Sequence, residues 1–446
     1  MPDYDRDVLN KARMATFDRS TASEAARAWI DAVMEVTLAH EASNHPRKRA
    51  RRQTDQLSFC RSVAAFAADL LRHSTNVRSQ GFMYRAADRE ELATTLVSSD
   101  NFDQLVKYWT ELDLIEKTKF INDRSDPEGL TASHSQRARR FRATRRFLLL
   151  AADYNIAADA ISDHFDVSHR HSNVVQVRAT RAPGKQHRGK LLKQQGQQFD
   201  DQRARVRHLN SLIAGHDYSL SESPMVRRVF NCGDRQDFRF NLGGRFYCAS
   251  DDNWMAMPKT ERAKIKIDGE ETTEIDVRAS HISILSSLTG RPLDRRVDPY
   301  AIEGIHRDIV KKVIVSAIGG GKMPTRWPKG FNDEFADSFG WEPRRHLKLI
   351  DVTDAITELH PFLLELKKAE LDWANLQFEE SECFFTAMMR LHNEGDAPSL
   401  PVHDSLIVRR RDAGYAAHCL RDAYEDRLGF RPHVDIPDVS FGYLVA

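Results

Sequence analysis

The sequence contains few of the residues that mark the most easily recognised protein classes. Its five cysteines are scattered over 446 residues and never occur in Cys-x-x-Cys spacing, so neither a disulfide framework nor a cysteine zinc site is predicted. Glycine and proline, at 21 and 16 residues, are too few for a collagen-like or low-complexity chain. No run approaches the about 18 apolar residues of a membrane span, and the first residues do not resemble a signal peptide. We therefore expect a cytoplasmic protein with no membrane partner, and the composition leaves its oligomeric state open.

Charge is balanced overall but unevenly distributed. Lys and Arg number 66 against 65 Asp and Glu, a net charge of +1. Residues 131–210 hold sixteen Lys or Arg and six Asp with no Glu, so 16 − 6 gives +10 for this block. Such asymmetry is typical of a segment that faces a polyanion, although a solvated charged surface produces the same pattern. Two shorter basic clusters also indicate a polyanionic partner; these are residues 47–52 and Arg295-Arg296.

The N-terminal half predicts a nucleic-acid-binding module. Apolar residues between Phe102 and Leu112 recur with helical spacing after a run of N-cap residues, which predicts a helix over 100–112. A strand at 114–121, a polar loop at 122–136 and a basic strand at 139–144 follow. This order is that of a winged helix. We expect four outward side chains of the helix to enter a major groove and two arginines of the wing to hold phosphates; these are Asn101, Gln104, Lys107 and Tyr108, and Arg140 and Arg142. Winged helices also mediate protein–protein contacts, so a protein partner is the alternative to nucleic acid for this module.

Two aspartates are predicted at strand ends of one sheet. The run 264–267 is expected to pair with 272–276 across an Asp268-Gly269 turn, which places Asp276 at a strand-to-helix junction. Much later, two strand-like runs flank a polar tip that contains Asp404. Two carboxylates on neighbouring strand ends can hold two Mg²⁺ ions about 3.5–4 Å apart for in-line phosphoryl transfer. A turn aspartate that only caps backbone N–H groups is the structural alternative for each.

A helix between these aspartates carries two cations on one face. Arg307, Lys311 and Val315 are spaced by four residues in the segment 306–321, which ends in three glycines. This face predicts a triphosphate-binding surface. The alternative is an exposed basic helix that ends at a glycine C-cap.

The order of these motifs resembles the palm and fingers of family A DNA polymerases and the related single-subunit phage and mitochondrial RNA polymerases. The resemblance covers about residues 237–446 and rests on five motifs in order: Gly244-Arg245, Asp276, His281, the Arg-x-x-x-Lys of 307–311, and Val402-His403-Asp404. The chain is also similar to uncharacterised bacterial and prophage proteins with the same Gly-Gly-Arg-Phe-Tyr and His-Asp-Ser runs. That second likeness implies no activity.

The resemblance implies a right-hand polymerase palm and fingers domain in the C-terminal half. Together with the helical, winged-helix-like N-terminal part predicted from the residues, this gives an α+β fold. The expected segments are an N-terminal helical region (1–60), the winged-helix-like module (61–150), a basic connecting or thumb-like region (151–235) and the palm and fingers (236–446).

The same resemblance implies roles for individual residues. Asp276, Asp404 and the Val277 carbonyl would bind two Mg²⁺ ions, with Mn²⁺ as the substitute. Arg307 and Lys311 would hold the phosphates of a nucleoside triphosphate, with His281 and Val315 beside the nucleotide. Arg245 and His403 would contact the primer–template, which is DNA or RNA. The glutamates 379, 380 and 382 are expected to have no metal role.

Departures from the family leave the choice of sugar open. The chain has Val315 and Gly319 where the family usually has aromatic residues. It has His281 where the DNA enzymes have Glu. After the second aspartate it has Ser405, and serine at this place is typical of the RNA enzymes. We expect a template-directed nucleotidyltransferase, with DNA synthesis slightly favoured. The alternatives are a single-subunit RNA polymerase, a primase or a terminal transferase, and, in another class, a non-catalytic DNA-binding replication initiator or regulator.

Overall fold

The structure is a computed structural model that describes residues 4–86, 89–118, 138–181, 189–291, 293–294, 297–366 and 371–437. It is a mixed α+β chain that divides into two compact units, residues 1–173 and 174–446. The boundary lies inside the segment 151–235, which we expected to be one connecting region. Among the described residues, no helix is both long enough and apolar enough to cross a membrane. The calls on the loop at 122–136 and on Arg295-Arg296 lie outside the described residues.

The first unit is built around two long helices. Helix α2 begins after Ser23, whose side chain accepts the Ala26 N–H, and α3 follows it along the chain. The amphipathic helix α5 begins after Ser98, which caps it in the same way. Buried aromatic residues such as Trp29, Phe66 and Trp109 form the core of this unit. Its helices are α1 (Arg6–Asn10), α2 (Glu24–Asn44), α3 (Gln53–His73), α4 (Arg89–Leu92), α5 (Ser99–Glu111), α7 (Arg145–Ala152), α8 (Ile161–His164) and α9 (Ser168–Ser172), with the 3-10 turn η1 (Val77–Ser79).

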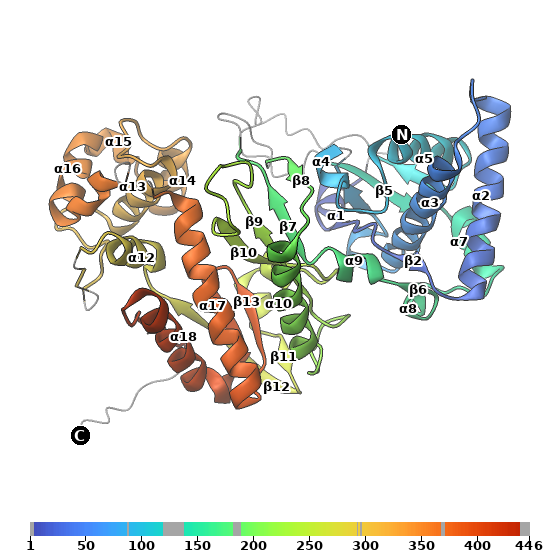
Figure 1. Cartoon of the computed structure of the whole chain (residues 1–446). Helices are drawn as coiled ribbons and strands as arrows, with labels where there is room; N and C mark the ends of the chain where they lie inside the picture. Colours follow the sequence, from blue (N-terminus) through green and yellow to red (C-terminus); the bar gives the residue numbers. More distant parts are fainter. Residues whose placement is uncertain are drawn as a thin grey trace. The chain divides into compact units, whose positions relative to one another are not determined.

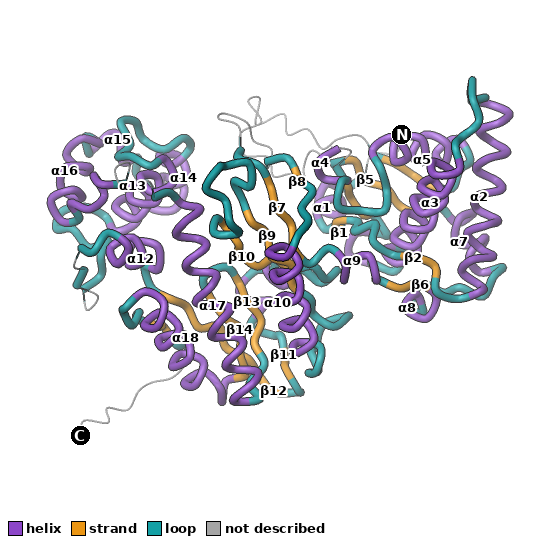
Figure 2. The backbone as a smooth tube through the Cα atoms, viewed as in Figure 1, coloured by secondary structure: helices purple, strands orange, loops and turns teal. Residues whose placement is uncertain are grey.

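Short strands complete the first unit (Figure 2). A four-stranded sheet has the order β1-β3-β5-β4, and β2 pairs with β6. These strands are β1 (Arg13–Met14), β2 (Ser20–Thr21), β3 (Met83–Arg85), β4 (Ile115–Lys117), β5 (Arg139–Ala143) and β6 (Phe165–Asp166). The order α5, β4, β5 is the predicted order of helix and strands. The assignment as a winged helix stays a prediction.

The described residues of the second unit form two sheets. In one, β8, β7, β9 and β10 lie in the order β10-β9-β7-β8. In the other, the order is β11-β12-β14-β13, and β15 also pairs with β12. The strands are β7 (Val175–Arg178), β8 (Leu191–Leu192), β9 (Val226–Phe230), β10 (Gly243–Cys248), β11 (Lys266–Ile267), β12 (Glu270–Val277), β13 (Ser399–Val402), β14 (Ser405–Arg409) and β15 (Val434–Asp435).

The two predicted turns had different outcomes. The hairpin β11–β12 turns at Asp268 and Gly269, whose φ angles of 52° and 78° suit a tight two-residue turn, so that prediction is confirmed. The strand-like runs 238–240 and 245–247 around Gly243-Gly244 predict a second hairpin, and this prediction is wrong, because 238–240 forms no strand and β10 pairs with β9 instead. Gly244, with a φ of 76°, lies where an added Cβ would be 3.1 Å from the Arg228 guanidinium, so this glycine serves close packing rather than a hairpin turn.

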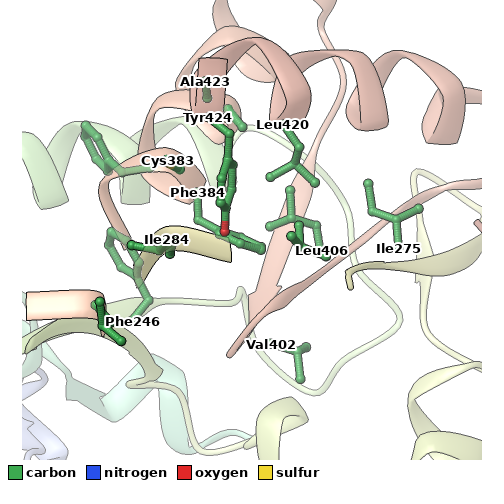
Figure 3. Packing of buried hydrophobic residues seen from close by; sticks show 14 of the residues in the cluster. Phe246, Ile275, Ile284, Cys383, Phe384, Val402, Leu406, Leu420, Ala423 and Tyr424 are labelled. Atoms are coloured by element: carbon green, nitrogen blue, oxygen red, sulfur yellow. The ribbon is translucent and has the colours of Figure 1, made fainter. Parts of the chain in front are cut away.

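Helices cover the sheet of the second unit that contains β12 and β14. Helix α17 packs against α18, α12 and β10, and the helices α12 to α16 gather around one end of α17 (Figure 1). Tyr424, Phe384 and Leu406 pack together in the core between α17, α18 and the sheet (Figure 3). The helices are α10 (Gln197–Ile213), α11 (Lys259–Arg262), α12 (Ser280–Leu288), α13 (Arg307–Gly320), α14 (Phe331–Phe339), α15 (Pro343–His346), α16 (Leu349–Leu359), α17 (Trp373–Gly395) and α18 (Ala413–Leu428), with the 3-10 turns η2 (Trp254–Ala256), η3 (Pro361–Glu365) and η4 (Arg410–Asp412).

Candidate active site

Strand pairing brings the two predicted aspartates together. Asp276 on β12 lies opposite Ser405 on β14, and the Val277 N–H donates to the Asp404 carbonyl at 3.2 Å. Asp404 stands at the exposed turn between β13 and β14, where His403 adopts a φ of 54°. On the other side of β12, Asp435 of β15 lies opposite Asp276. Three carboxylates thus meet at one end of the sheet.

The Asp276 carboxyl is in an unfavourable place for an anion. Burial is the largest cause that raises its pKa, and the negative charges of Asp404, Asp435 and Glu274 raise it further. Lys311 opposes this change, and the resulting pKa is about 6. A half-buried carboxyl with a raised pKa, facing other carboxylates, is the electrostatic setting that a bound cation relieves.

A cavity of about 560 Å³ lies over these carboxylates. Eight of the residues predicted for the site from the sequence line it, and His403 is not among the lining residues. The cavity also contains residues that the sequence analysis did not single out for the site. Its lining is Arg245, Asp276, Val277, Arg278, Ala279, Ser280, His281, Asp298, Tyr300, Arg307, Lys311, Val315, Glu380, Asp404 and Asp435.

The cations of α13 face this cavity from one side. Helix α13 begins after His306 and ends at Gly321, whose φ is 64°, as its glycine-rich end predicted. Arg307, Lys311 and Val315 are exposed on one face, while residues such as Val310 and Ile314 bury the other.

Arg307 is already held by neighbouring groups. Its guanidinium forms an ion pair with Asp298 and lies 5.2 Å from the centre of the Tyr300 ring. The hydrogen bond from Arg307 is the largest favourable influence on the Asp298 carboxyl; together with other contacts it outweighs the effect of burial, and the pKa of Asp298 is lowered. These contacts orient the guanidinium toward the cavity.

Arg245 is paired inside the protein. Its Nε donates to Glu380 Oε2 at 3.1 Å, and its Nη2 lies 3.2 Å from His281 Nε2. Glu380 is only 1% exposed. Burial opposes ionisation of this carboxyl, but the charges and hydrogen bonds of His281 and Arg245 outweigh burial and hold its pKa at about 2. Glu380 is therefore an anionic support for these two side chains at the edge of the cavity.

The other predicted contact to a primer–template, His403, lies beside the cavity lining. Its ring is 6.4 Å from the ring of Tyr247, centre to centre. Burial, and then the charge of Arg245, lower its pKa, which favours the neutral imidazole.

A second, smaller cavity of about 370 Å³ adjoins the first along α13 and shares Lys311 and Val315 with it. Its opposite wall is α14, which contributes Phe331, Phe335 and Phe339. Aromatic rings are thus present beside Val315 even though α13 itself lacks them.

The predicted nucleic-acid contacts of α5 have partners within the first unit. Asn101 donates to Ser62 Oγ at 3.0 Å, and Gln104 accepts from Arg51 at 3.2 Å. Lys107 Nζ lies 3.2 Å from His45 Nδ1. The expected outward position of Tyr108 is wrong, because its ring is 6% exposed and its hydroxyl donates to Glu41.

The two arginines of β5 differ. The expected exposed position of Arg140 is wrong: it is 1% exposed, and its Nε donates to the Leu9 carbonyl at 3.0 Å. Helix α1 and its following residues cover that side of the strand. Arg142 is half-buried and pairs with Glu116 at 2.8 Å.

Seven residues of the cavity lining were not predicted as site residues, among them Asp298, Tyr300, Glu380 and Asp435. Asp298 and Tyr300 lie in the connection between α12 and α13, and Asp435 lies in a two-residue strand. Glu380 was expected to have no metal role, and its support of Arg245 and His281 was not predicted. The one local signal for Asp435 is a carboxylate between the two apolar residues Val434 and Ile436.

No protein-family model matches the chain, and no curated protein matches it. Among solved structures, a similar one is the POL domain of Pol1 from M. smegmatis in complex with DNA primer-template and dNTP. The match has 10% sequence identity and a TM-score of 0.28, and it covers 97% of this chain and 68% of that chain. A similarity at this TM-score carries no argument about the activity of this chain.

Proposed function

We propose that the second unit is a template-directed nucleotidyltransferase that extends a nucleic-acid 3′-OH with nucleoside triphosphates. The observation that carries this proposal is one cavity in which Asp276 and Asp404, brought together by strand pairing, face the cationic face of α13. A phosphoryl-transfer site needs carboxylates that bind divalent cations and basic side chains that bind phosphates.

The carboxylates fit Mg²⁺ by their chemistry. Carboxylate and carbonyl oxygens are the ligands that this ion prefers, and burial together with the neighbouring carboxylates raises the pKa of Asp276, an effect that a bound cation would oppose. Asp276, Asp404 and the Val277 carbonyl would hold the ions, with Mn²⁺ as the substitute. Ions bound there would lower the pKa of the attacking hydroxyl and neutralise charge on the leaving pyrophosphate.

The side chains of α13 would bind the triphosphate. Arg307 and Lys311 lie one helical turn apart, a spacing of about 6 Å that suits successive phosphates. Phosphate would displace Asp298 from Arg307, while Tyr300 keeps the guanidinium plane in place. His281 and Val315 would border the sugar and base.

The nucleic-acid strand would approach past Arg245 and His403. Because Glu380 anchors Arg245, the guanidinium would present its remaining N–H groups to a phosphate without losing its position. In the first unit, Asn101, Gln104, Lys107 and Arg142 remain the proposed contacts to DNA or RNA, and Arg140 is withdrawn because it is buried.

A non-catalytic DNA-binding regulator is the second candidate. The pairing of Arg307 with Asp298 and of Arg245 with Glu380 favours it, because both cations already have carboxylate partners within the unit. In that case the cavity would be a remnant of a catalytic site and the protein would act through binding alone.

An extension assay separates the two candidates. Purified protein and Mg²⁺ are incubated with labelled dNTPs or NTPs, each with a primed template, an unprimed template or a single strand. We expect incorporation on the primed template, abolished by Asp276→Ala and by Asp404→Ala. Asp337→Ala, an exposed carboxylate of α14, is the matched control and should incorporate normally.

The pattern of products decides among the alternatives. Activity with NTPs alone indicates an RNA polymerase or primase, and extension without a template indicates a terminal transferase. Equal inactivity of the wild type and both alanine variants, with DNA binding retained, would establish the regulator instead.

A further inference from the structure

Two histidines and a glutamate, none of which the proposed function uses, converge at the surface of the first unit. His40 belongs to α2, His45 is the C-cap residue of that helix, and Glu111 is the last residue of α5. His40 Nε2 and His45 Nε2 lie 2.8 Å and 2.6 Å from the same oxygen, Glu111 Oε2. All three ligand atoms lie within 4.8 Å of one another.

We propose that His40, His45 and Glu111 bind one Zn²⁺ ion. Two imidazole nitrogens and one carboxylate oxygen are a donor set that Zn²⁺ favours, at bond lengths of about 2.0–2.2 Å. Tetrahedral bonds of that length separate the ligand atoms by about 3.3 Å. The two N···O separations of 2.8 Å and 2.6 Å need to open by about 0.5–0.7 Å, and the two nitrogens, which lie within 4.8 Å of each other, need to settle at the same spacing. Water completes the coordination.

Packing already orients one of the rings. The His45 imidazole is stacked on Tyr108, with ring centres 5.2 Å apart and planes 10° apart. Tyr108 is in turn fixed by its hydrogen bond to Glu41. The Glu111 side chain is 39% exposed and the two histidine side chains 12% and 24%, so an ion can reach the site from solvent.

Neighbouring polar groups act on the site in different ways. Asn44 Nδ2 lies 3.2 Å from His40 Nδ1 and donates to the His40 carbonyl at 3.2 Å. When His40 Nε2 binds metal, a turn of the amide would let its oxygen accept a hydrogen bond from Nδ1–H, at the expense of the bond to the carbonyl. Lys107 Nζ lies 3.2 Å from His45 Nδ1, and its positive charge opposes an incoming cation. Arg47 and Arg51 are paired with Glu41 and add further positive charge nearby.

The ion would join two helix ends at the start of a basic segment. His45 is followed directly by Pro46 and by the cluster at residues 47–52. Fixing His45 to Glu111 therefore holds the beginning of that segment against α5, which carries Gln104 and Lys107.

Titration calorimetry of the full chain with ZnCl₂ at pH 7.5, after treatment with a chelator, tests the proposal. To keep the carboxylates of the second unit out of the measurement, the titration is repeated in Asp276→Asn. We expect one Zn²⁺ per chain in both proteins. Glu111→Gln and His45→Ala are expected to weaken binding at least about 100-fold, since changes that do not even touch the metal cost about 10–100-fold.

Two matched variants sharpen the result. Lys107→Ala should tighten binding, because it removes the opposing charge. His418→Ala removes a surface histidine that is paired with Asp422 in α18 and should leave binding unchanged. If His45→Ala fails to fold, Glu111→Gln decides, because it keeps the shape of a partly exposed side chain.

Zn²⁺ binding that is absent, or that Glu111→Gln leaves at wild-type strength, would overturn the proposal and leave these residues as an ion-pair cluster only. The outcome is independent of polymerase activity.

Discussion

Replacing Asp276 by asparagine should stabilise the metal-free protein while removing its activity. The pKa of the carboxyl is about 6 in the folded protein against an ordinary value of 3.8, with burial as the main cause and the nearby carboxylates as the next. The folded protein thus holds this proton more tightly than the unfolded chain does. Stability falls as pH rises from about 4 to about 6, and the penalty is complete above about pH 7.

The size of this penalty follows from the two pKa values. Their difference of about two pKa units corresponds to about 3 kcal/mol for a fully buried group. Because Asp276 is only half-buried, solvent screens part of the repulsion, and we expect about 1–2 kcal/mol. Asp276→Asn removes the penalty, so its gain in the free energy of unfolding should be about 1–2 kcal/mol at pH 7.5 and about a third to a half of that at pH 4.5.

Urea unfolding in EDTA at the two pH values measures this gain. Asp337→Asn, the exposed control on α14, should change stability by less than about 0.5 kcal/mol at both. Millimolar Mg²⁺ should stabilise the wild type and not Asp276→Asn, since only the wild type retains the full ligand set. A variant that is destabilised at pH 7.5, or equally stabilised at both pH values, would refute the electrostatic reasoning.

Three further outcomes are expected. Lys311→Ala should lower the extension rate at least about 10-fold, while Lys312→Ala, which loses a surface ion pair, should change it little in the same assay. Asp298→Asn should tighten the binding of inorganic tripolyphosphate several-fold in calorimetry at low salt, because it removes the carboxylate that competes for the guanidinium on α13; weaker binding would show that Asp298 is needed for orientation instead. Glu382→Gln should destabilise the fold by about 3–5 kcal/mol in urea unfolding, since it leaves the fully buried Arg228 guanidinium without its anionic partner.

Local sequence signals predicted the elements that carry the site. The Asp268-Gly269 turn fixed the register of β11 and β12, and that register determined which face of β12 carries Asp276. Helical spacing placed Arg307 and Lys311 on one face, and Gly321 marked the end of their helix. Each of these signals acts over a few residues, so it can be interpreted without knowledge of the tertiary fold.

Contacts between distant segments could not be predicted in this way. Asp435 belongs to a two-residue strand whose pairing with β12 spans more than 150 residues, and Asp298 lies in a loop that carries no periodic pattern. Arg140 was predicted as a contact residue but is buried. Its place in the basic strand predicted an exposed side chain on β5, but the Leu9 carbonyl of α1 accepts a hydrogen bond from Arg140 Nε, and the side chain is buried. Alternation identifies the two faces of a strand and not which of them is covered.

The charges of the cavity imply that metal and triphosphate binding depend on each other. Without ligands, burial and then the charges of the neighbouring carboxylates raise the pKa of Asp276, and Arg307 is occupied by Asp298. A polyanion that enters alone meets an anionic sheet end, and a divalent cation that enters alone gains no phosphate oxygens as ligands. Each ligand removes the obstacle to the other. Because coupling between binding sites is reciprocal, the factor by which Mg²⁺ tightens triphosphate binding must equal the factor by which triphosphate tightens Mg²⁺ binding.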